Sequence, residues 1–568
     1  MQSWDQTFDV VVIGAGTGGM SAALTARTEG LSVLLLEKTD RIGGSTATSG
    51  GVVWVPANAQ AAAIGHADTA EQAITYLAHT VGDATPALLQ ERFARSASQM
   101  LDYMSRHDLV KLAARAHAPD YYPDLPGATM GGRAMDPVVF DGRLLGSHFR
   151  KLRDPLKPFT VLGGMMVNTA DAKHLLAVTR SFASWRHGVG LVWRYLVDRL
   201  RGHHRGTRLV LGNSLAGQLF HGVVRLGIPH WLGASVEKIH VDSGAVQGVR
   251  VSHGGRTIDV RALRGVVVAT GGFPWNADMR ARLYPKPTGE WSMAPEGNRG
   301  EGIALAQAAG GVLGKGAAGP ALWAPVSILH QRDGETVRYP HLVWDRAKPG
   351  LMAVNSAGRR FVNESTTYHE FVLAMQRSHA EVPTIPAYLV CDADFIEKWG
   401  LGLALPGGRP RQHLIDAGYL HEAGSLDALA ARLRVDADGL KASAKQFNEA
   451  AQTGTDTAFG KGSDEYNRHL GDPLHPGPNP CLGPLERAPF FAIAVYAGDI
   501  GTAIGIQCNE NSQALDEAGC PIRGLYAAGN DMHSVMGGRY PSAGITLGPA
   551  LTFGWLAGQH LARQVPST

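Results

Sequence analysis

Six residues near the start of the chain, Gly14-Ala15-Gly16-Thr17-Gly18-Gly19, have the types and spacing that hold a pyrophosphate. Gly14 allows a tight turn, Gly16 lets the backbone approach the phosphates, and Gly19 lets a following helix pack closely on the preceding strand. The N-terminus of that helix adds unpaired N–H groups and the positive end of its dipole. Glu37 lies 18 residues after Gly19, where a carboxylate would bind ribose hydroxyls. The pattern predicts a dinucleotide-binding site.

The elements that such a site needs flank the glycine loop. An apolar run over residues 8–13 predicts a buried strand before the loop. Residues 20–28 predict a helix after it, and residues 31–36 a second strand that ends at Glu37. This strand, loop, helix and strand order is the opening of a Rossmann-like domain.

A second loop follows Glu37 and distinguishes between cofactors. It begins at Lys38 and is dense in glycine and hydroxyl residues, among them Gly44, Ser45, Thr46, Ser49, Gly50 and Gly51. An NAD dehydrogenase has no need of such a loop, whereas a flavoprotein must also enclose the ribityl chain and the ring. The loop therefore favours FAD; an ordinary glycine-rich surface turn is the alternative.

The chain is expected to return to the cofactor in later segments. A buried strand over residues 264–268 ends in Ala269-Thr270-Gly271, and another over residues 524–528 enters a turn at Gly529 and Asn530. Gly544 precedes a helix predicted over residues 545–562, whose N-terminus would lie at the pyrimidine end of a flavin, where negative charge grows on reduction. The remaining cofactor contacts are expected at Val236, Thr546 and Leu547.

Composition limits the partners and the location. The 568 residues are 44% hydrophobic and 18% charged, as in a packed globular protein, and a formal charge of +3 gives no case for nucleic-acid binding. Four cysteines without CxxC spacing argue against a metal site or a disulfide framework and fit a reducing cytoplasm. The sequence shows neither a signal-peptide pattern nor an uninterrupted apolar run of 18 residues, so no spanning helix is expected.

We expect an α/β protein with a discontinuous Rossmann-like FAD-binding domain and an inserted α+β catalytic domain. The FAD-binding domain would comprise residues 1–150, 207–310 and 485–568, and the catalytic domain residues 311–484. Residues 151–206 form a basic excursion that is helical in pattern from residue 165 to residue 200. This excursion is interpreted either as a membrane-surface or lid element that collects an apolar substrate, or as an amphipathic helix packed on the body.

Motifs in a fixed order identify a family resemblance. GAGTGG, EKTDRIGGSTATSGG, DYYP, RGVVVATGGF, FVNESTTY, GDIGT, GLYAAGN and RYPSAGITLGPALTFG cover nearly the whole chain. They resemble the FAD-dependent 3-ketosteroid dehydrogenases of the 3-oxosteroid 1-dehydrogenase type, within the fumarate reductase/succinate dehydrogenase flavoprotein superfamily. The steroid assignment rests on the tyrosines of DYYP, NESTTY and RYPSAG.

The resemblance implies a role for each of these tyrosines. Tyr540 would donate to the C3 carbonyl of a steroid, with the N–H of Gly544 as the second donor of an oxyanion hole. Tyr368 would remove the C2 proton, Tyr121 would assist by hydrogen bonding, and hydride would pass from C1 to N5 of FAD. A tyrosine base needs a pKa below its usual value near 10. From the residues alone, the paired tyrosines of DYYP could instead serve only in packing.

Three other functions stay open. Ser542 stands where many 1-dehydrogenases have glycine, and it resembles the 3-ketosteroid 4-dehydrogenases that act on 5α-steroids. Arg539 and His369 could hold the carboxylates of a fumarate-type substrate, although a dianion needs several convergent cations. The third alternative is a flavin-binding protein without catalysis, which no iron–sulfur cysteine pattern supports. The sequence does not identify the electron acceptor or the oligomeric state.

Overall fold

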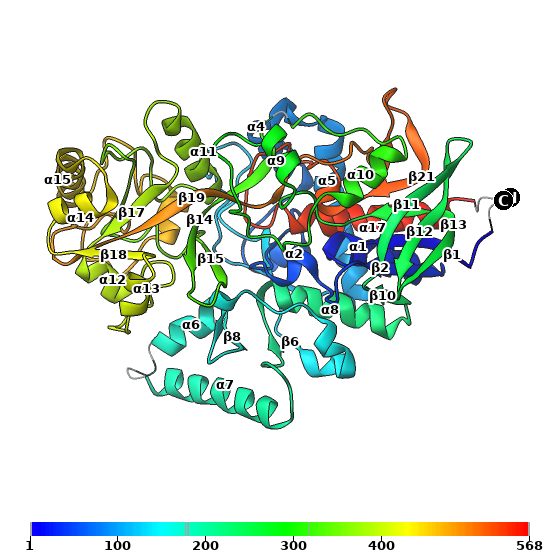
Figure 1. Ribbon diagram of the computed structural model, residues 1–568, viewed down its shortest axis with the longest axis horizontal. Coiled ribbons are helices and arrows are strands. Elements are labelled where there is room, and N and C mark those ends of the chain that lie inside the picture. The colour runs from blue at the N-terminus through cyan, green and yellow to red at the C-terminus, as the bar shows by residue number, and fades with distance from the viewer. Residues whose placement is uncertain (1–2, 177, 179–180, 317, 566–568) are drawn as a thin grey trace.

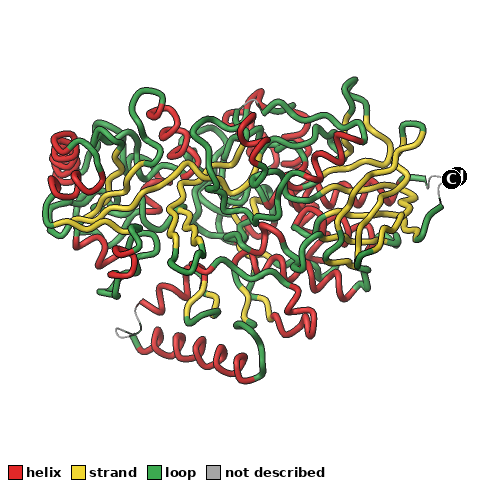
Figure 2. The backbone as a smooth tube through the Cα atoms, in the orientation of Figure 1, coloured by secondary structure: helices red, strands yellow, loops and turns green. Residues whose placement is uncertain are grey.

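Two β-sheets organise the fold, one toward each end of its long axis, and a smaller projection lies to one side of them (Figure 1). The computed structural model describes residues 3–176, 178, 181–316 and 318–565. Figure 2 shows the strands of the two sheets as separate groups with helices between and around them.

The first sheet has eight strands and carries the glycine loop. Its order is β10-β2-β1-β13-β12-β21-β20, with β11 paired to β12. The strands are β1 (Gln6–Ile13), β2 (Val33–Glu37), β10 (His230–Leu232), β11 (Ser235–Asp242), β12 (Ala245–His253), β13 (Arg256–Val268), β20 (Gln513–Leu515) and β21 (Pro521–Ala527). The central strands β1, β2 and β13 pair in parallel, and their apolar runs are buried because helices cover the sheet. The Rossmann-like α/β fold predicted from the sequence is confirmed.

Helices from the two ends of the chain pack together beside this sheet. They are α1 (Thr17–Thr28) and α17 (Leu547–Arg563). Ser21 Oγ donates to the carbonyl of Leu551 over 2.7 Å, a contact between residues 530 positions apart. The helix predicted over residues 545–562 is α17, which begins at Leu547 and ends at Arg563.

The second sheet has six strands in the order β15-β14-β19-β17-β16, with β18 paired to β19. The strands are β14 (Ala321–His330), β15 (Thr336–Pro340), β16 (Leu351–Val354), β17 (Ala387–Cys391), β18 (Leu420–Ala423) and β19 (Phe490–Thr502). Helix α11 (Tyr368–His379) packs against β14. Because β19 lies beyond residue 484, we propose that the second domain includes residues 485–502 as well as residues 311–484.

The projection, residues 151–206, differs from the sequence expectation. A ribbon of β7 (Thr160–Val161) and β8 (Met165–Met166) precedes α6 (Thr169–Leu176) and α7 (Phe182–Leu200). The helical pattern expected over residues 165–200 is present in α6 and α7, whereas Met165 and Met166 pair as a strand before them. Residues 177, 179 and 180, within that range, lie outside the described residues.

The remaining elements connect or cover these parts. They are α2 (Gly44–Ala47), α3 (Ala59–Ala63), α4 (Ala70–Thr80), α5 (Ala87–Arg106), α8 (Leu211–Arg225), α9 (Ala277–Leu283), α10 (Glu301–Ala308), α12 (Ala393–Trp399), α13 (Gln412–Asp416), α14 (Leu426–Leu433), α15 (Ala437–Thr453), α16 (Glu465–Leu470), β3 (Val53–Trp54), β4 (Leu112–Ala114), β5 (Ala134–Pro137), β6 (Phe140–Asp141) and β9 (Arg208–Leu209). In the described ranges, no helix is both long and apolar enough to cross a membrane.

Candidate active site

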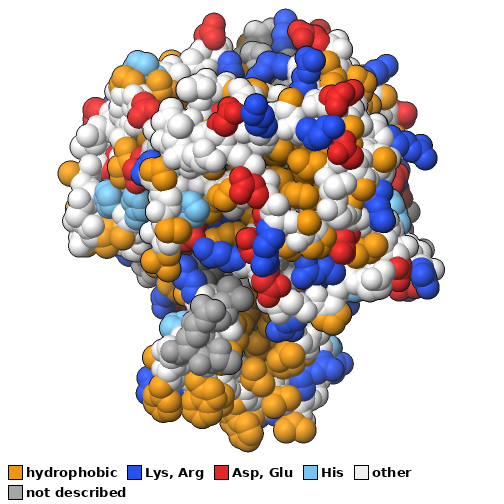
Figure 3. Space-filling view, turned by 90° about the vertical axis from the view of Figure 1, so that its left-hand side faces the viewer, with side chains coloured by type: hydrophobic (Ala, Val, Ile, Leu, Met, Phe, Trp, Pro, Cys, Tyr) orange, Lys and Arg blue, Asp and Glu red, His pale blue; other side chains and the backbone are white. Residues whose placement is uncertain are grey.

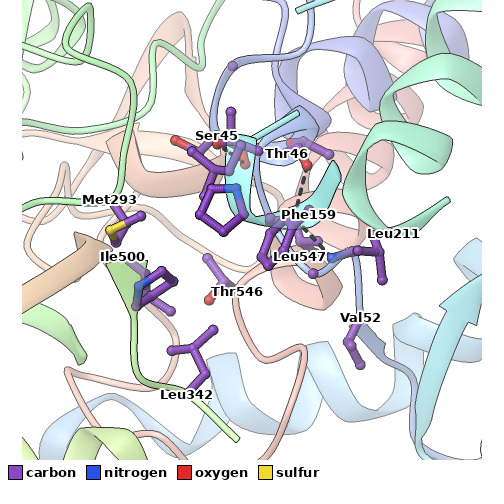
Figure 4. A pocket seen from close by; sticks show the side chains of 18 of the residues that line it. Ser45, Thr46, Val52, Phe159, Leu211, Met293, Leu342, Ile500, Thr546 and Leu547 are labelled. Carbon is purple, nitrogen blue, oxygen red and sulfur yellow. Dashed lines mark hydrogen bonds between the residues drawn. The ribbon is translucent and has the colours of Figure 1, made fainter. Parts of the chain in front are cut away.

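A single cavity of about 1840 Å³ joins the glycine loop, the three tyrosines and the projection. Sites for one small molecule usually measure about 300–1,000 Å³, so this cavity has room for a cofactor and a second ligand. Figure 4 shows Thr46, Phe159, Ile500 and Thr546 around it, from four widely separated segments. The expected cofactor residues that line it are Gly14, Gly16, Thr17, Gly18, Glu37, Lys38, Gly44, Ser45, Thr46, Ser49, Gly50, Gly51, Val236, Ala269, Thr270, Gly271, Gly529, Asn530, Gly544, Thr546 and Leu547.

The glycine loop has the geometry of a phosphate cradle. Gly14 has a φ of +104°, and a Cβ on it would lie 2.2 Å from the carbonyl oxygen of Ala269. A Cβ on Gly16 would meet no atom within 4 Å, so the space beside it is open toward the cavity. Gly19 does not line the cavity; a Cβ there would lie 1.9 Å from the carbonyl oxygen of Gly14. The loop therefore offers room for a pyrophosphate beside Gly16 and close helix packing at Gly19.

The carboxylate of Glu37 lies against the backbone of the loop. Its Oε2 accepts from the N–H of Ala15 over 3.1 Å, and its Oε1 accepts from the N–H of Thr39 over 3.0 Å. Lys38, the next residue, forms an ion pair with Glu301 over 2.5 Å. These contacts fix Glu37 at the carboxyl end of β2, where the carboxylate faces the cavity.

Alanine at Gly16 and at Gly19 should have different effects. Gly16→Ala should fold normally, because its backbone angles (φ −83°, ψ −175°) suit alanine, but it should weaken FAD binding roughly tenfold or more by crowding the phosphates. Gly19→Ala should instead lower the free energy of unfolding by about 1–3 kcal/mol, since its Cβ clashes with the loop itself.

Fluorescence titration of the apoprotein with FAD and chemical unfolding would measure the two effects. Gly424→Ala is the matched control, because a Cβ there also meets open space but lies away from the cavity. Unchanged FAD affinity in Gly16→Ala would contradict the assignment of this loop.

The opposite end of the cradle is formed by the start of α17. Gly544 has a φ of +92°, and its carbonyl accepts from the N–H of Trp54 over 3.1 Å. The N–H of Gly544 donates to no acceptor among the residues that the structure describes, and Gly544 lines the cavity. A free donor and a helix N-terminus at this point fit the electron-rich end of a flavin ring or a carbonyl oxygen bound beside it.

Three tyrosines from distant segments meet beside this end. Tyr121 Oη donates to Tyr368 Oη over 3.0 Å. The ring of Tyr540 stacks on that of Tyr121 at 5.6 Å and meets that of Tyr368 edge-on at 5.1 Å. All three are nearly buried and line the cavity. The structure thus brings together the residues that the family resemblance singled out.

Backbone contacts hold the DYYP loop against the segment of Tyr540. The N–H of Tyr121 and the hydroxyl of Tyr76 both donate to the carbonyl of Pro541, over 3.0 and 2.6 Å. Beneath the loop, Asp120 accepts from Arg133 over 2.8 Å. A buried ion pair with further hydrogen bonds gives this loop one defined position, so the stacking of Tyr121 on Tyr540 is fixed by the surrounding structure.

Burial controls the protonation of the cluster. It raises the pKa of Tyr540, and it raises the pKa of Tyr121 and of Tyr368 well above the usual range, with the neighbouring phenols adding to the effect. The three hydroxyls therefore carry their protons at neutral pH. A protonated Tyr540 is suited to donating a hydrogen bond, whereas Tyr368 would need to lose its proton before it could act as a base.

Two residues of the site were not predicted. Tyr466 is buried with its ring 4.8 Å from that of Tyr121. Arg115 lines the cavity and forms a bidentate pair with Asp136, at 2.8 and 2.7 Å. Neither residue lies in one of the motifs that the sequence singled out, so the sequence carried no signal for them.

The residues behind two alternative functions lie outside the cavity lining. Arg539 is exposed. His369 is buried and neutral, since burial lowers its pKa to about 3, and its Nδ1 accepts from the N–H of Trp323. Ser542 is also buried away from the cavity. Arg539 and His369 therefore provide no pair of cations for a dicarboxylate. Ser542 does not line the cavity in which a ligand would bind.

Apolar side chains surround the part of the cavity next to the projection. Phe159, Leu162 and Met165 contribute from the projection, and Leu342 and Leu405 from the second domain. Sequence reasoning connected the projection with an apolar substrate but named none of these residues. Their convergence depends on how the projection folds back onto the body, which no local pattern encodes.

Comparison with known proteins identifies the class. A family model described as an FAD binding domain matches residues 9–547, and the chain belongs to this family. A 3-oxosteroid 1-dehydrogenase of Mycobacterium tuberculosis is 35% identical over 98% of this chain and 99% of its own length. A 4-oxocyclohex-2-ene-1-carboxylate 5-dehydrogenase of Sinomonas cyclohexanicum is 37% identical over 98% of this chain and 94% of its own.

A solved structure extends this comparison. The crystal structure of a 3-ketosteroid delta1-dehydrogenase from Sterolibacterium denitrificans in complex with 1,4-androstadiene-3,17-dione superposes with a TM-score of 0.91 at 36% identity, covering 98% of this chain and 99% of that chain. The protein is a FAD-dependent oxidoreductase, and its resemblance to the 3-ketosteroid dehydrogenases is confirmed.

Proposed function

We propose that the protein dehydrogenates a 3-ketosteroid between C1 and C2 of ring A. The observation that carries the proposal is the meeting of Tyr121, Tyr368 and Tyr540 beside an apolar chamber, in the same cavity as the FAD cradle. When bound, FAD supplies the acceptor for the hydride from C1. The chain's own residues have to polarise the carbonyl and remove the neighbouring proton.

Tyr540 and Gly544 are proposed to polarise the carbonyl. A proton on C2 becomes acidic only when the negative charge that develops on the C3 oxygen is stabilised. Tyr540 remains protonated because burial raises its pKa, and the N–H of Gly544 is free to donate. Two donors fixed before the reaction starts stabilise an enolate without further reorganisation.

Tyr368 is proposed to remove the C2 proton. It is the first residue of α11, so its phenolate would lie at the positive end of that helix. Tyr121 holds the hydroxyl of Tyr368 in place through a hydrogen bond of 3.0 Å. Burial and the neighbouring phenols of Tyr121 and Tyr540 raise the pKa of Tyr368, so the helix N-terminus is the effect that favours its anion.

This role predicts a characteristic pH profile. Because the pKa of Tyr368 is raised well above 10, its basic form is scarce at neutral pH and becomes more abundant as pH rises. The value of kcat/KM should therefore increase about tenfold per pH unit between roughly pH 7 and 9. Steady-state rates across this range measure the slope. A flat profile would exclude a tyrosine with a raised pKa as the base.

The ion pair of Arg115 with Asp136 favours a steroid substrate over a cyclohexanone carboxylate. Recognition of a carboxylate needs an available cation in the site, and Arg115, one of the cations that line the cavity, is paired with Asp136 at 2.7 Å. The apolar part of the cavity next to the projection suits a ligand whose carbon skeleton has several rings. We therefore favour the substrate class of the steroid relatives over that of the Sinomonas cyclohexanicum relative.

The position of the new double bond distinguishes 1-dehydrogenation from 4-dehydrogenation. Ser542, which raised the alternative, is buried and does not line the cavity, and this supports the 1-dehydrogenase. NMR of the products from a saturated 5α-3-ketosteroid and from a 4-en-3-one should show a C1–C2 double bond in both. A C4–C5 double bond from the saturated substrate would identify a 4-dehydrogenase.

Anaerobic mixing with a 3-ketosteroid tests catalysis itself. Loss of the flavin absorption near its long-wavelength maximum is expected with the steroid and not with succinate or 4-oxocyclohexanecarboxylate. No bleaching with any of the three would leave a flavin-binding role without this chemistry.

Peripheral contact of the projection with a membrane is also part of this proposal.

A further inference from the structure

The outward face of α7 carries a continuous apolar stripe. The stripe consists of Phe182, Trp185, Val189, Trp193, Leu196 and Leu200, and its members recur every three or four residues, as one face of a helix requires. Trp193 is 68% exposed and Leu200 is 87% exposed. The stripe is about 27 Å long at the rise of an α-helix. Figure 3 shows hydrophobic side chains gathered along the outer edge of the projection.

The opposite face of α7 is already packed. Leu191 and Tyr195 form a small core with Met165, and the hydroxyl of Tyr195 donates to the carbonyl of Leu162 over 2.9 Å. Asp198 is buried and accepts from the N–H and the hydroxyl of Thr207, both over 2.8 Å. The helix therefore has a fixed orientation, and the outer stripe is not needed to attach it to the body.

The charges beside the stripe are of one sign. Arg186, Arg199 and Arg201 are exposed on α7 and at its end. Asp198, the helix's only acidic residue, is buried. Apolar side chains flanked by arginines, with two tryptophans among them, suit the boundary between the headgroups and acyl chains of an anionic bilayer. A second copy of the chain on this face would bring like charges together, so a lipid surface is the better complement.

The mouth of the cavity lies beside the same projection. Val161 and Leu162, in the ribbon that precedes α7, are exposed and also line the cavity. Across from them, Trp344 and Leu405 of the second domain are likewise exposed and line it. A rim of large apolar side chains around an opening gives an apolar molecule a path that avoids water.

We propose that the outer stripe of α7 docks on an anionic phospholipid bilayer and turns the rim of the cavity toward it, so that the apolar substrate enters from the membrane. The nature of that substrate rests on the proposed function, whereas the docking does not. Docking and catalysis can therefore be tested separately.

Flotation with vesicles tests the docking. The holoenzyme should float with vesicles of phosphatidylcholine that contain phosphatidylglycerol, and less with phosphatidylcholine alone. Leu200→Glu and Trp193→Glu should each lower the bound fraction roughly tenfold, and Arg199→Gln about fivefold at low salt. Leu88→Glu is the matched control, because Leu88 is an exposed leucine on α5, outside the projection, and it should bind as the wild type does.

Wild-type protein that stays in solution with both kinds of vesicle would overturn the proposal. Sedimentation without lipid provides the other outcome: a dimer that Leu200→Glu converts to monomers would show that the stripe binds a second copy instead. Equal binding by all variants would show that another surface is responsible.

Delivery of the substrate tests the orientation of the rim. With steroid dissolved in the vesicles, Trp193→Glu should raise KM several-fold, while kcat stays unchanged and the KM for steroid carried by cyclodextrin stays at the wild-type value. An unchanged KM with both carriers, in a variant that no longer floats, would refute entry from the membrane even if docking is confirmed.

Discussion

Tyr368→Phe should lower kcat by about 100- to 10,000-fold while FAD and the steroid remain bound. The substitution removes the oxygen that we propose accepts the C2 proton, but it retains the ring that packs edge-on against Tyr540. Binding of the steroid, followed as a shift of the flavin spectrum, should be within a few-fold of the wild type. Stopped-flow measurement of anaerobic flavin reduction would give the loss directly.

A structural role for Tyr368 would give a different result. Loss of FAD or of thermal stability in Tyr368→Phe would mean that its hydroxyl holds the cluster together and does not take part in proton transfer. Tyr122→Phe is the matched control, because Tyr122 neighbours Tyr121 in the same loop but bonds to Glu370 and lies outside the cavity lining. This control should keep kcat within a few-fold and retain the alkaline rise of kcat/KM.

Tyr540→Phe should lower kcat by about 100- to 1,000-fold, because it removes one of the two donors proposed for the developing oxyanion. The backbone donor of Gly544 remains, so the loss should be smaller than that in Tyr368→Phe. The stacked contact with Tyr121 at 5.6 Å persists with phenylalanine. FAD content measured after gel filtration should stay at the wild-type level.

The two tyrosine substitutions differ in their pH profiles. Tyr540→Phe keeps the base, so kcat/KM should still rise with pH at its lower level. Residual activity in Tyr368→Phe should lose that slope. Near wild-type turnover in Tyr540→Phe would show that Gly544 or another group polarises the carbonyl without help from this hydroxyl.

The cofactor cradle was predictable because its signals are local. Gly14 and Gly19 leave room for neighbouring backbone and Gly16 leaves room for phosphates, and Glu37 follows from the length of one helix and one strand. The tyrosine cluster was predictable only through the family resemblance. Nothing in the order of residues 121, 368 and 540 indicates that their rings meet.

Pairing and packing account for what the sequence did not show. The helical structure expected from residue 165 begins later because Met165 pairs with Val161, and apolar residues at this point also suit a ribbon. Arg539 and His369 have types suited to carboxylates, but exposure of one and burial of the other decide their chemistry. Burial and orientation of this kind depend on the assembled fold.

The packing of α1 on α17 has a consequence for biosynthesis. The phosphate loop precedes α1 and the ring donor precedes α17, so translation must pass residue 563 before both halves of the FAD site exist. Until then, the first half of the Rossmann sheet has to persist without the helix that covers it. Ser21 and Leu551, 530 positions apart, are joined by a hydrogen bond between the two helices, and FAD binding would stabilise the folded state by mass action, by about 2.7 kcal/mol at a hundredfold excess over its Kd. Supply of the vitamin precursor should therefore control how much of the protein accumulates in a cell as well as how much of it is active.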